Sequence, residues 1–226
     1  MNRRYIIGAI VAAVIVAAVL VALSLAGGSE DTMVSSIDGV EEVKAELNGI
    51  PSSGNTIGKA DATVEIIEYG DTSCPSCRAA AETSIPQVID EFVRPGEVKM
   101  SFRPIAFINR SSERGALGAE AAGMQDAMWA FVQLIYANQG PESEQDWLTD
   151  ELLEEAATKL GLDVEKWKTD YQGEPVASQF FERQTQADAD EVTGTPFFVV
   201  KGPNGEDSFS GAAGLSRFRE AIEKVN

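Results

Sequence analysis

The chain has 226 residues, with 36 acidic side chains against 18 basic ones and no histidine, so its formal net charge is −18. Proteins that bind nucleic acid present a basic surface to the phosphates, and this balance argues against a nucleic-acid partner. With only two cysteines and no histidine, the chain lacks the four ligands of a closed zinc site, and we expect neither a metal site nor a cofactor.

Residues 5–26 form an uninterrupted uncharged stretch rich in valine, alanine, isoleucine and leucine. A helix needs ~20 apolar residues to cross the bilayer, so this stretch predicts a transmembrane anchor. Arg3 and Arg4 precede it, which keeps residues 1–4 in the cytoplasm and the rest of the chain outside, where disulfides persist. A cleaved signal peptide is the alternative, since Ser24-Leu25-Ala26 resembles a cleavage site, but its apolar region should span only ~7–15 residues.

Residues 27–55 are expected to form a tether and an N-terminal extension, followed by one domain over residues 56–226. Small polar residues after the anchor are typical of a tether. A short amphipathic helix is predicted over 36–47, because apolar residues recur there at helical spacing. A turn is predicted over Pro51–Asn55.

The two cysteines lie in the sequence Cys74-Pro75-Ser76-Cys77, directly after the strand-like run Thr63–Tyr69. A CxxC motif where a strand leads into a helix is typical of a redox dithiol. A thiol at a helix start faces unpaired backbone N–H groups and the positive end of the helix dipole, so Cys74 is the expected nucleophile. Pro75 suits the first helical position, and Cys77 lies one turn further along, where it resolves a mixed disulfide. A disulfide between these two cysteines closes only a very short loop and would stabilise the fold little, so a purely structural role is not expected. Binding of Cu(I) by the two thiolates remains an alternative.

The remaining elements predict an α/β domain. A helix is expected over 77–93, bent or divided at Pro86, and a strand over 98–105, which together make a right-handed crossover. Between about residue 111 and residue 190 only helical patterns occur. A strand at 196–200, a hairpin turn at Asn204-Gly205, a strand at 207–210 and a closing helix over 215–225 complete the chain. Four aromatic residues of the helical block are expected to be packing residues: Trp129, Trp147, Trp167 and Tyr171.

Over about residues 50–226 the sequence resembles the DsbA-type thiol-disulfide oxidoreductases, in their membrane-anchored extracytoplasmic branch. The resemblance rests on the segment 50–58, on Glu68-Tyr69-Gly70-Asp71 before the CxxC motif, on the helical block, and on Val192-Thr-Gly-Thr-Pro-Phe-Phe198. It implies a thioredoxin fold, a mixed β-sheet flanked by helices, with an all-helical insertion at about 111–190.

The resemblance also implies roles for three residues outside the CxxC motif. Pro196, after Thr195, matches the family's cis-proline beside the dithiol, where the backbone pairs with substrate like an added strand. Glu68 occupies the place of the family's buried acid. Glu65 and Glu68 point to opposite faces of a strand, so at least one enters the core, where burial raises its pKa and lets it shuttle the proton of the resolving thiol.

The implied activity is donation of disulfides to unfolded or reduced exported proteins, with a membrane or soluble redox partner that resets the dithiol. The dipeptide Pro75-Ser76 lacks the histidine of the strongest oxidants in this family. An extracytoplasmic reductase or isomerase is therefore an alternative, and a Cu(I)-binding or peptide-binding module on the same fold is another.

Overall fold

A computed structural model describes residues 36–226. The predicted transmembrane segment at residues 5–26 and most of the predicted tether lie outside these residues. Among the helices of residues 36–226, none combines the length and the apolar character that crossing a membrane requires.

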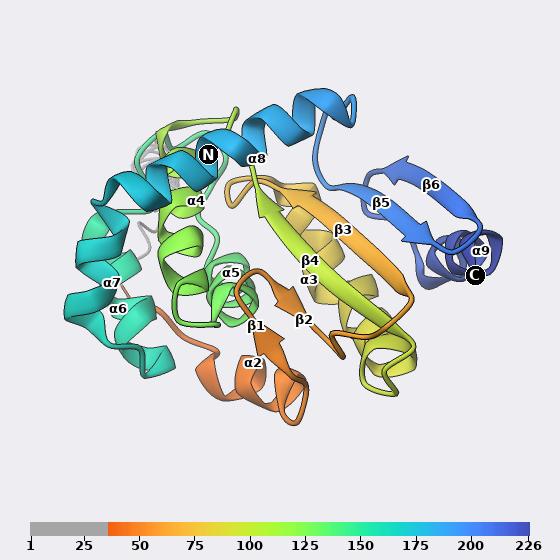
Figure 1. Ribbon diagram of the computed structural model, residues 1–226. Helices are drawn as coiled ribbons and strands as arrows, with labels where there is room; N and C mark the ends of the chain where they lie inside the picture. The colour runs from red at the N-terminus through yellow and green to blue at the C-terminus, as the bar shows by residue number, and fades with distance from the viewer. Residues whose placement is uncertain (1–35) are drawn as a thin grey trace, which may run out of the picture. The chain divides into compact units, whose positions relative to one another are not determined.

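A six-stranded mixed sheet forms the centre of the domain, in the order β1-β2-β4-β3-β5-β6. The strands are β1 (Ser52–Ser53), β2 (Thr56–Ile57), β3 (Val64–Gly70), β4 (Val98–Pro104), β5 (Phe197–Gly202) and β6 (Gly205–Ser210). Only β3 and β4 are parallel, and every other neighbouring pair is antiparallel. Figure 1 shows β3 and β4 in the middle of the molecule, with the β5–β6 hairpin and the C-terminal helix at one edge.

The parallel pair is joined by helix α3 (Pro75–Val88) and a single π-helical segment, η1 (Ile89–Val93). Pro75 occupies the first turn of α3, where a missing N–H leaves no helical hydrogen bond unmade. Pro86 lies inside α3, and the wider π turn follows it. The predicted helix over 77–93 is confirmed, but α3 continues past Pro86 and the helix type changes only at Ile89.

Five helices lie between β4 and β5, and no strand occurs among them. They are α4 (Arg110–Gly123), α5 (Met128–Ala137), α6 (Asp150–Leu160), α7 (Val164–Tyr171) and α8 (Glu174–Ala189). Local sequence sets several of their ends. Thr149 and Asp163 accept backbone N–H bonds at the starts of α6 and α7, and Gly161 ends α6 in the left-handed conformation. The prediction that this region is helical is confirmed.

The N-terminal extension contains more structure than the sequence indicated. Helix α2 (Val40–Leu47) falls within the predicted range 36–47, with Val43 in the core. The predicted turn at 51–55 is only partly a turn, because Ser52 and Ser53 form strand β1 and the turn itself is limited to Gly54 and Asn55. Strands β1 and β2 extend the sheet beyond β4. Strands of two residues are too short to give an alternating pattern in the sequence.

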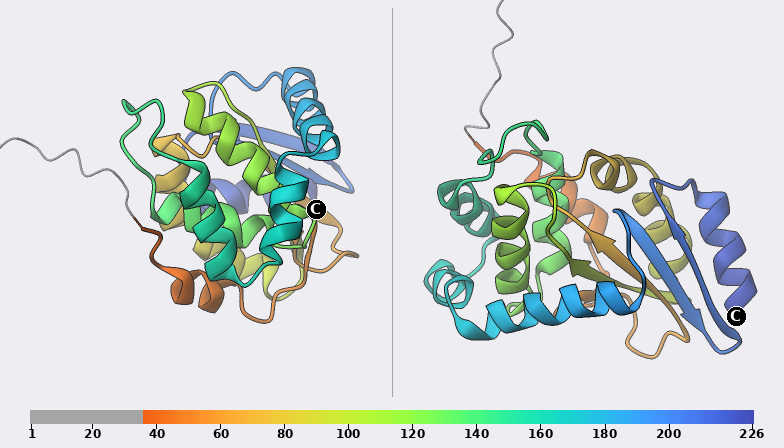
Figure 2. Two further views of the ribbon diagram at one scale, coloured as in Figure 1. Left: turned by 90° about the vertical axis from the view of Figure 1, so that its left-hand side faces the viewer. Right: turned by 90° about the horizontal axis from the view of Figure 1, so that it is seen from above.

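Helices cover both faces of the sheet (Figure 2). Helix α3 and the C-terminal helix α9 (Leu215–Val225) lie on one face, and α8 crosses the other. Side chains alternate between these faces along β3. Ile66 belongs to the large core beneath α3, and Ile67 and Tyr69 belong to a smaller cluster on the opposite face. The carboxyl end of β3 leads into α3, and the CxxC motif is located at this junction.

Candidate active site

Cys74 lies at the N-terminal end of helix α3, immediately before its first residue, with an extended backbone (φ −82°, ψ 116°). Its Sγ accepts a hydrogen bond from the backbone N–H of Cys77 at 3.3 Å, the contact that a serine or aspartate oxygen makes at an ordinary helix start. Both cysteines are free thiols in the structure. The helix start therefore directs its unpaired N–H groups at one sulfur.

The surroundings of the two thiols shift their pKa values in opposite directions. A hydrogen bond from the Cys77 side chain is the largest cause that lowers the pKa of Cys74 to about 6. The Thr195 side chain and the N–H groups of Cys77 and Ser76 lower it further, against the opposing effect of burial. Burial raises the pKa of the Cys77 thiol well above its ordinary value, and the hydrogen bond to Cys74 adds to this. Cys74 is 6% exposed and Cys77 is fully buried, so only the activated sulfur reaches the surface.

The loop before β5 closes the other side of Cys74. The Thr195–Pro196 peptide bond is cis, as the family resemblance implied. In the thiol form, Cys74 Sγ donates a hydrogen bond to the carbonyl oxygen of Thr195 at 3.3 Å, although the two residues are 121 positions apart. Cys74, Cys77, Thr195 and Pro196 are thus brought together at one site, in which Cys77 and Pro196 are buried.

Glu68 lies on β3 directly between Phe102 of β4 and Phe198 of β5, on the face that packs against α3. It is 2% exposed. Burial raises the pKa of Glu68 to about 8, and the negative charge of Cys74 contributes to the rise. Glu65 accepts a hydrogen bond from Ser101 Oγ at 2.5 Å and is only partly buried. The prediction that at least one of the two acids enters the core is confirmed, and Glu68 is the buried one.

Asp71 and Gln139 hold the loop that leads into Cys74, and the sequence analysis assigned a role to neither. The Asp71 carboxylate accepts N–H bonds from Ser73 at 2.8 Å and Phe107 at 3.1 Å. Gln139 Nε2 donates to the carbonyl oxygens of Thr72 at 2.7 Å and Cys74 at 3.1 Å. The position of Asp71, directly after a buried strand, was the available signal, whereas nothing in the sequence marks Gln139.

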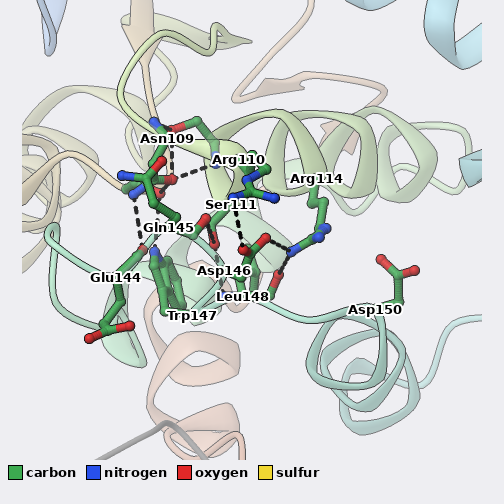
Figure 3. A network of polar contacts seen from close by, with 12 residues as sticks. Asn109, Arg110, Ser111, Arg114, Glu144, Gln145, Asp146, Trp147, Leu148 and Asp150 are labelled. Atoms are coloured by element: carbon green, nitrogen blue, oxygen red, sulfur yellow. Dashed lines mark hydrogen bonds and ion pairs between the residues drawn. The ribbon is translucent and has the colours of Figure 1, made fainter. Parts of the chain in front are cut away.

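A polar network connects the same loop to the helical block, and Figure 3 shows the part of this network around Asn109, Arg114 and Asp146. Asn109 caps α4 by accepting the Ser112 N–H, and it also accepts a hydrogen bond from Ser73 Oγ at 2.8 Å. The indole N–H of Trp147 donates to Ser73 Oγ at 3.1 Å. Asp146, next to it, pairs with Arg114 at 3.0 Å. Trp147 is a buried packing residue, as predicted, and its N–H also anchors the loop before the cysteines.

Comparison with known proteins agrees with this geometry. The family model described as Thioredoxin matches residues 52–224, which include every residue of the site described above. The chain belongs to this thioredoxin family.

Bacterial disulfide bond formation proteins are among its relatives. A probable disulfide bond formation protein D of Bacillus cereus is 33% identical over 157 residues, which cover 67% of this chain and 71% of that one. Disulfide bond formation protein D of Bacillus subtilis is 28% identical over 193 residues, covering 81% and 83%. The crystal structure of oxidised BdbD from Bacillus subtilis superposes with a TM-score of 0.67 at 28% identity, over 78% of this chain and 98% of that one. The chain belongs to the DsbA-type thiol-disulfide oxidoreductases, and the resemblance read from the sequence is confirmed.

Proposed function

We propose that the oxidised chain donates its Cys74–Cys77 disulfide to reduced exported proteins, with Cys74 as the sulfur that exchanges with substrate. The observation that carries the proposal is the asymmetry of the two thiols: the pKa of Cys74 is lowered to about 6, and that of Cys77 is raised well above its ordinary value. A stabilised thiolate favours the reduced form of the enzyme, and an enzyme whose reduced form is stabilised is an oxidant.

The reaction begins when a substrate thiolate attacks Cys74 Sγ in the disulfide. The bond between the two cysteine sulfurs breaks and its electron pair stays on Cys77, which takes up a proton. Glu68 is the proposed donor, because it is buried on the face of β3 that packs against α3 and its pKa is raised to about 8, so it holds a proton near neutral pH. The products are a mixed disulfide at Cys74, a Cys77 thiol and an ionised Glu68.

The second thiolate of the substrate then attacks its own sulfur in the mixed disulfide and displaces Cys74. A thiolate with a low pKa is a good leaving group, so the lowered pKa of Cys74 assists this step. Reoxidation runs in the opposite sense. Cys74 attacks the disulfide of a redox partner, Cys77 gives its proton to Glu68, and the Cys77 thiolate displaces the partner from Cys74.

Thr195 and Pro196 are proposed to hold the substrate backbone beside Cys74. The carbonyl oxygen of Thr195 lies 3.3 Å from Cys74 Sγ, so a polypeptide bound along this loop has its cysteine next to the reactive sulfur. Recognition through backbone groups is independent of side chains, which suits an enzyme that oxidises many unfolded clients.

The proposed setting is the outer face of a cell membrane. Residues 5–26 are the proposed single-pass anchor, with residues 1–4 cytoplasmic and the catalytic domain extracytoplasmic. A chain outside the cytoplasm meets exported proteins before their cysteines are paired, and it needs a membrane or soluble partner that restores its disulfide. The relatives named for disulfide bond formation support the extracytoplasmic setting, and the anchor rests on the sequence alone.

The test is a stoichiometric oxidation. The oxidised full chain is mixed with an unstructured peptide that carries two thiols, and peptide disulfide is quantified by mass. We expect one peptide disulfide for each chain reduced, and none with the Cys74→Ser variant. A peptide that stays reduced while the wild-type chain stays oxidised would contradict the proposal. If the reduced chain instead reduces the oxidised peptide nearly to completion, the protein is a reductase.

A further inference from the structure

The buried acid of the site has an unused hydrogen-bonding capacity. Glu68 Oε1 is fully buried and has no hydrogen-bond partner among residues 36–226. An ionised carboxylate between Phe102 and Phe198 is costly without donors, yet the proposed cycle requires Glu68 to become ionised each time Cys77 gains a proton. A group that stabilises the ionised Glu68 carboxylate is therefore needed, an inference that rests on the proposed function.

Tyr136, on α5, carries a buried hydroxyl that could donate the hydrogen bond Glu68 lacks. The side chain is 2% exposed, and its Oη also lacks a hydrogen-bond partner within the described part of the chain. A buried tyrosine O–H usually finds an acceptor, because an unmade hydrogen bond in the interior costs free energy. Two unpartnered polar groups, one a donor and one an acceptor, therefore occur in the same core.

Two independent contacts place this hydroxyl on the face of the sheet that carries Glu68, two residues along β3 from it. A Cβ added to Gly70 would lie 2.7 Å from Tyr136 Oη, so the hydroxyl lies directly over Gly70. Gly70 is two residues after Glu68 on β3 and therefore faces the same side of the sheet. Phe102, the β4 residue opposite Glu68, also packs its ring edge-on against the Tyr136 ring, with centroids 6.4 Å apart.

We propose that Tyr136 is a positioning residue for the proton transfer at Cys77, and that its hydroxyl donates to the Glu68 carboxylate directly or through one bridging water. When Cys77 attacks Cys74 in a mixed disulfide, its proton goes to Glu68 and its electron pair forms the new bond. The Tyr136 O–H stabilises the ionised Glu68 that must exist before this transfer. The hydroxyl gives up no proton overall.

The charges around the cluster keep Tyr136 in its donor form. Burial raises the pKa of Tyr136 well above its ordinary value, and four nearby acidic groups add to the rise. The titratable groups that face Glu68 and Tyr136 are Cys74 and Cys77 at the start of α3 and Asp71 in the loop before it. Strands β4 and β5 present only Phe102 and Phe198 there. The phenol therefore stays protonated throughout the range in which Glu68 titrates.

A symmetrical aromatic disulfide that releases a coloured thiolate separates the two sulfur steps in the reduced full chain. Cys74 attacks the reagent in the first phase and releases one coloured thiolate. Cys77 then attacks the mixed disulfide in the second phase and releases another. The second phase requires an ionised Glu68, so in the wild type its rate should rise with pH around the pKa of about 8.

Tyr136→Phe keeps the ring and removes only the hydroxyl. Losing one hydrogen bond to a carboxylate changes its proton affinity by about ten-fold, so the midpoint of the second phase should move up by about one pH unit. Near neutral pH the second phase should slow by about ten-fold, with the first phase unchanged. Tyr171→Phe is the matched control, because Tyr171 donates to Asp150 on the helical block, and we expect no change in either phase.

A double-variant comparison excludes a purely structural effect. In a Glu68→Gln background, Tyr136→Phe should cause no further change in the second phase. An unshifted second phase in Tyr136→Phe, or equal slowing with and without Glu68, would overturn the role of Tyr136 and leave the proposed function standing. A wild-type chain without the first phase would contradict the proposed function itself.

Discussion

Replacing Cys77 tests how the active-site sulfur is activated. The largest cause that lowers the pKa of Cys74 is the hydrogen bond from the Cys77 side chain, and the total change is from 9.0 to about 6. A hydrogen bond to a charged group contributes ~1.5–3 kcal/mol, which corresponds to ~1–2 pKa units. Cys77→Ala should therefore raise the pKa of Cys74 to roughly 7–8. Cys77→Ser retains an O–H donor and should leave it near the wild-type value.

The assay is a pH titration of the thiolate absorbance in the ultraviolet, with alkylation by iodoacetamide as a second readout. Both variants have a single cysteine, so the titration reports Cys74 alone. At a pH close to the wild-type midpoint, the thiolate fraction in Cys77→Ala should fall roughly 5- to 50-fold relative to Cys77→Ser. If both variants titrate near 6, the activation comes from the backbone N–H groups and the helix start, and the assigned role of the Cys77 thiol is wrong.

Two further predictions concern Glu68 and the loop before Cys74. The pKa of Glu68 is raised from 4.5 to about 8, so the folded chain holds this proton where the unfolded chain has lost it, and the group lowers stability as pH rises through that window. Between these pH values the free energy of unfolding of Glu68→Gln should rise relative to that of the wild type by up to about 1.4 kcal/mol per pH unit. Denaturant unfolding at several pH values measures this, and the same pH dependence in both proteins would refute the prediction. Gln139→Ala removes the donor to Thr72 and Cys74 and should lower the free energy of unfolding by ~1–3 kcal/mol. The control Gln87→Ala, on the exposed surface of α3, should lower it by less than ~0.5 kcal/mol. Equal losses in the two variants would contradict the role of Gln139 in holding the loop before Cys74.

Local patterns in the sequence were sufficient for the residues that adjoin the sulfur pair. The two cysteines follow a buried strand and open a helix, and these features are encoded within about fifteen consecutive residues. Glu65 and Glu68 face opposite sides of the strand, so at least one of them was expected in the core, and the resemblance selects Glu68. Pro196 follows from the resemblance. Each of these predictions depends on chain neighbours or on a motif, and the structure places all of the residues at one point.

The groups that the sequence did not indicate make contacts over long separations. Gln139 reaches the carbonyl of Thr72 from 67 positions away, and Trp147 reaches Ser73 from 74 positions away. Tyr136 looks like one more apolar residue of α5 in the sequence, because its role depends on Gly70 lying under its hydroxyl. Such pairings are set by how α5 packs on the sheet, and helical periodicity carries no information about that docking.

The reduction potential of the Cys74–Cys77 couple tests the central claim most directly. The full chain is equilibrated with glutathione buffers of known ratio near neutral pH, and the oxidised fraction is read from intrinsic fluorescence and confirmed by mass after alkylation. A disulfide donor with a stabilised Cys74 thiolate should have a potential clearly less negative than that of thioredoxin, which is about −270 mV. A value at or below about −270 mV would contradict disulfide donation and favour a reductase.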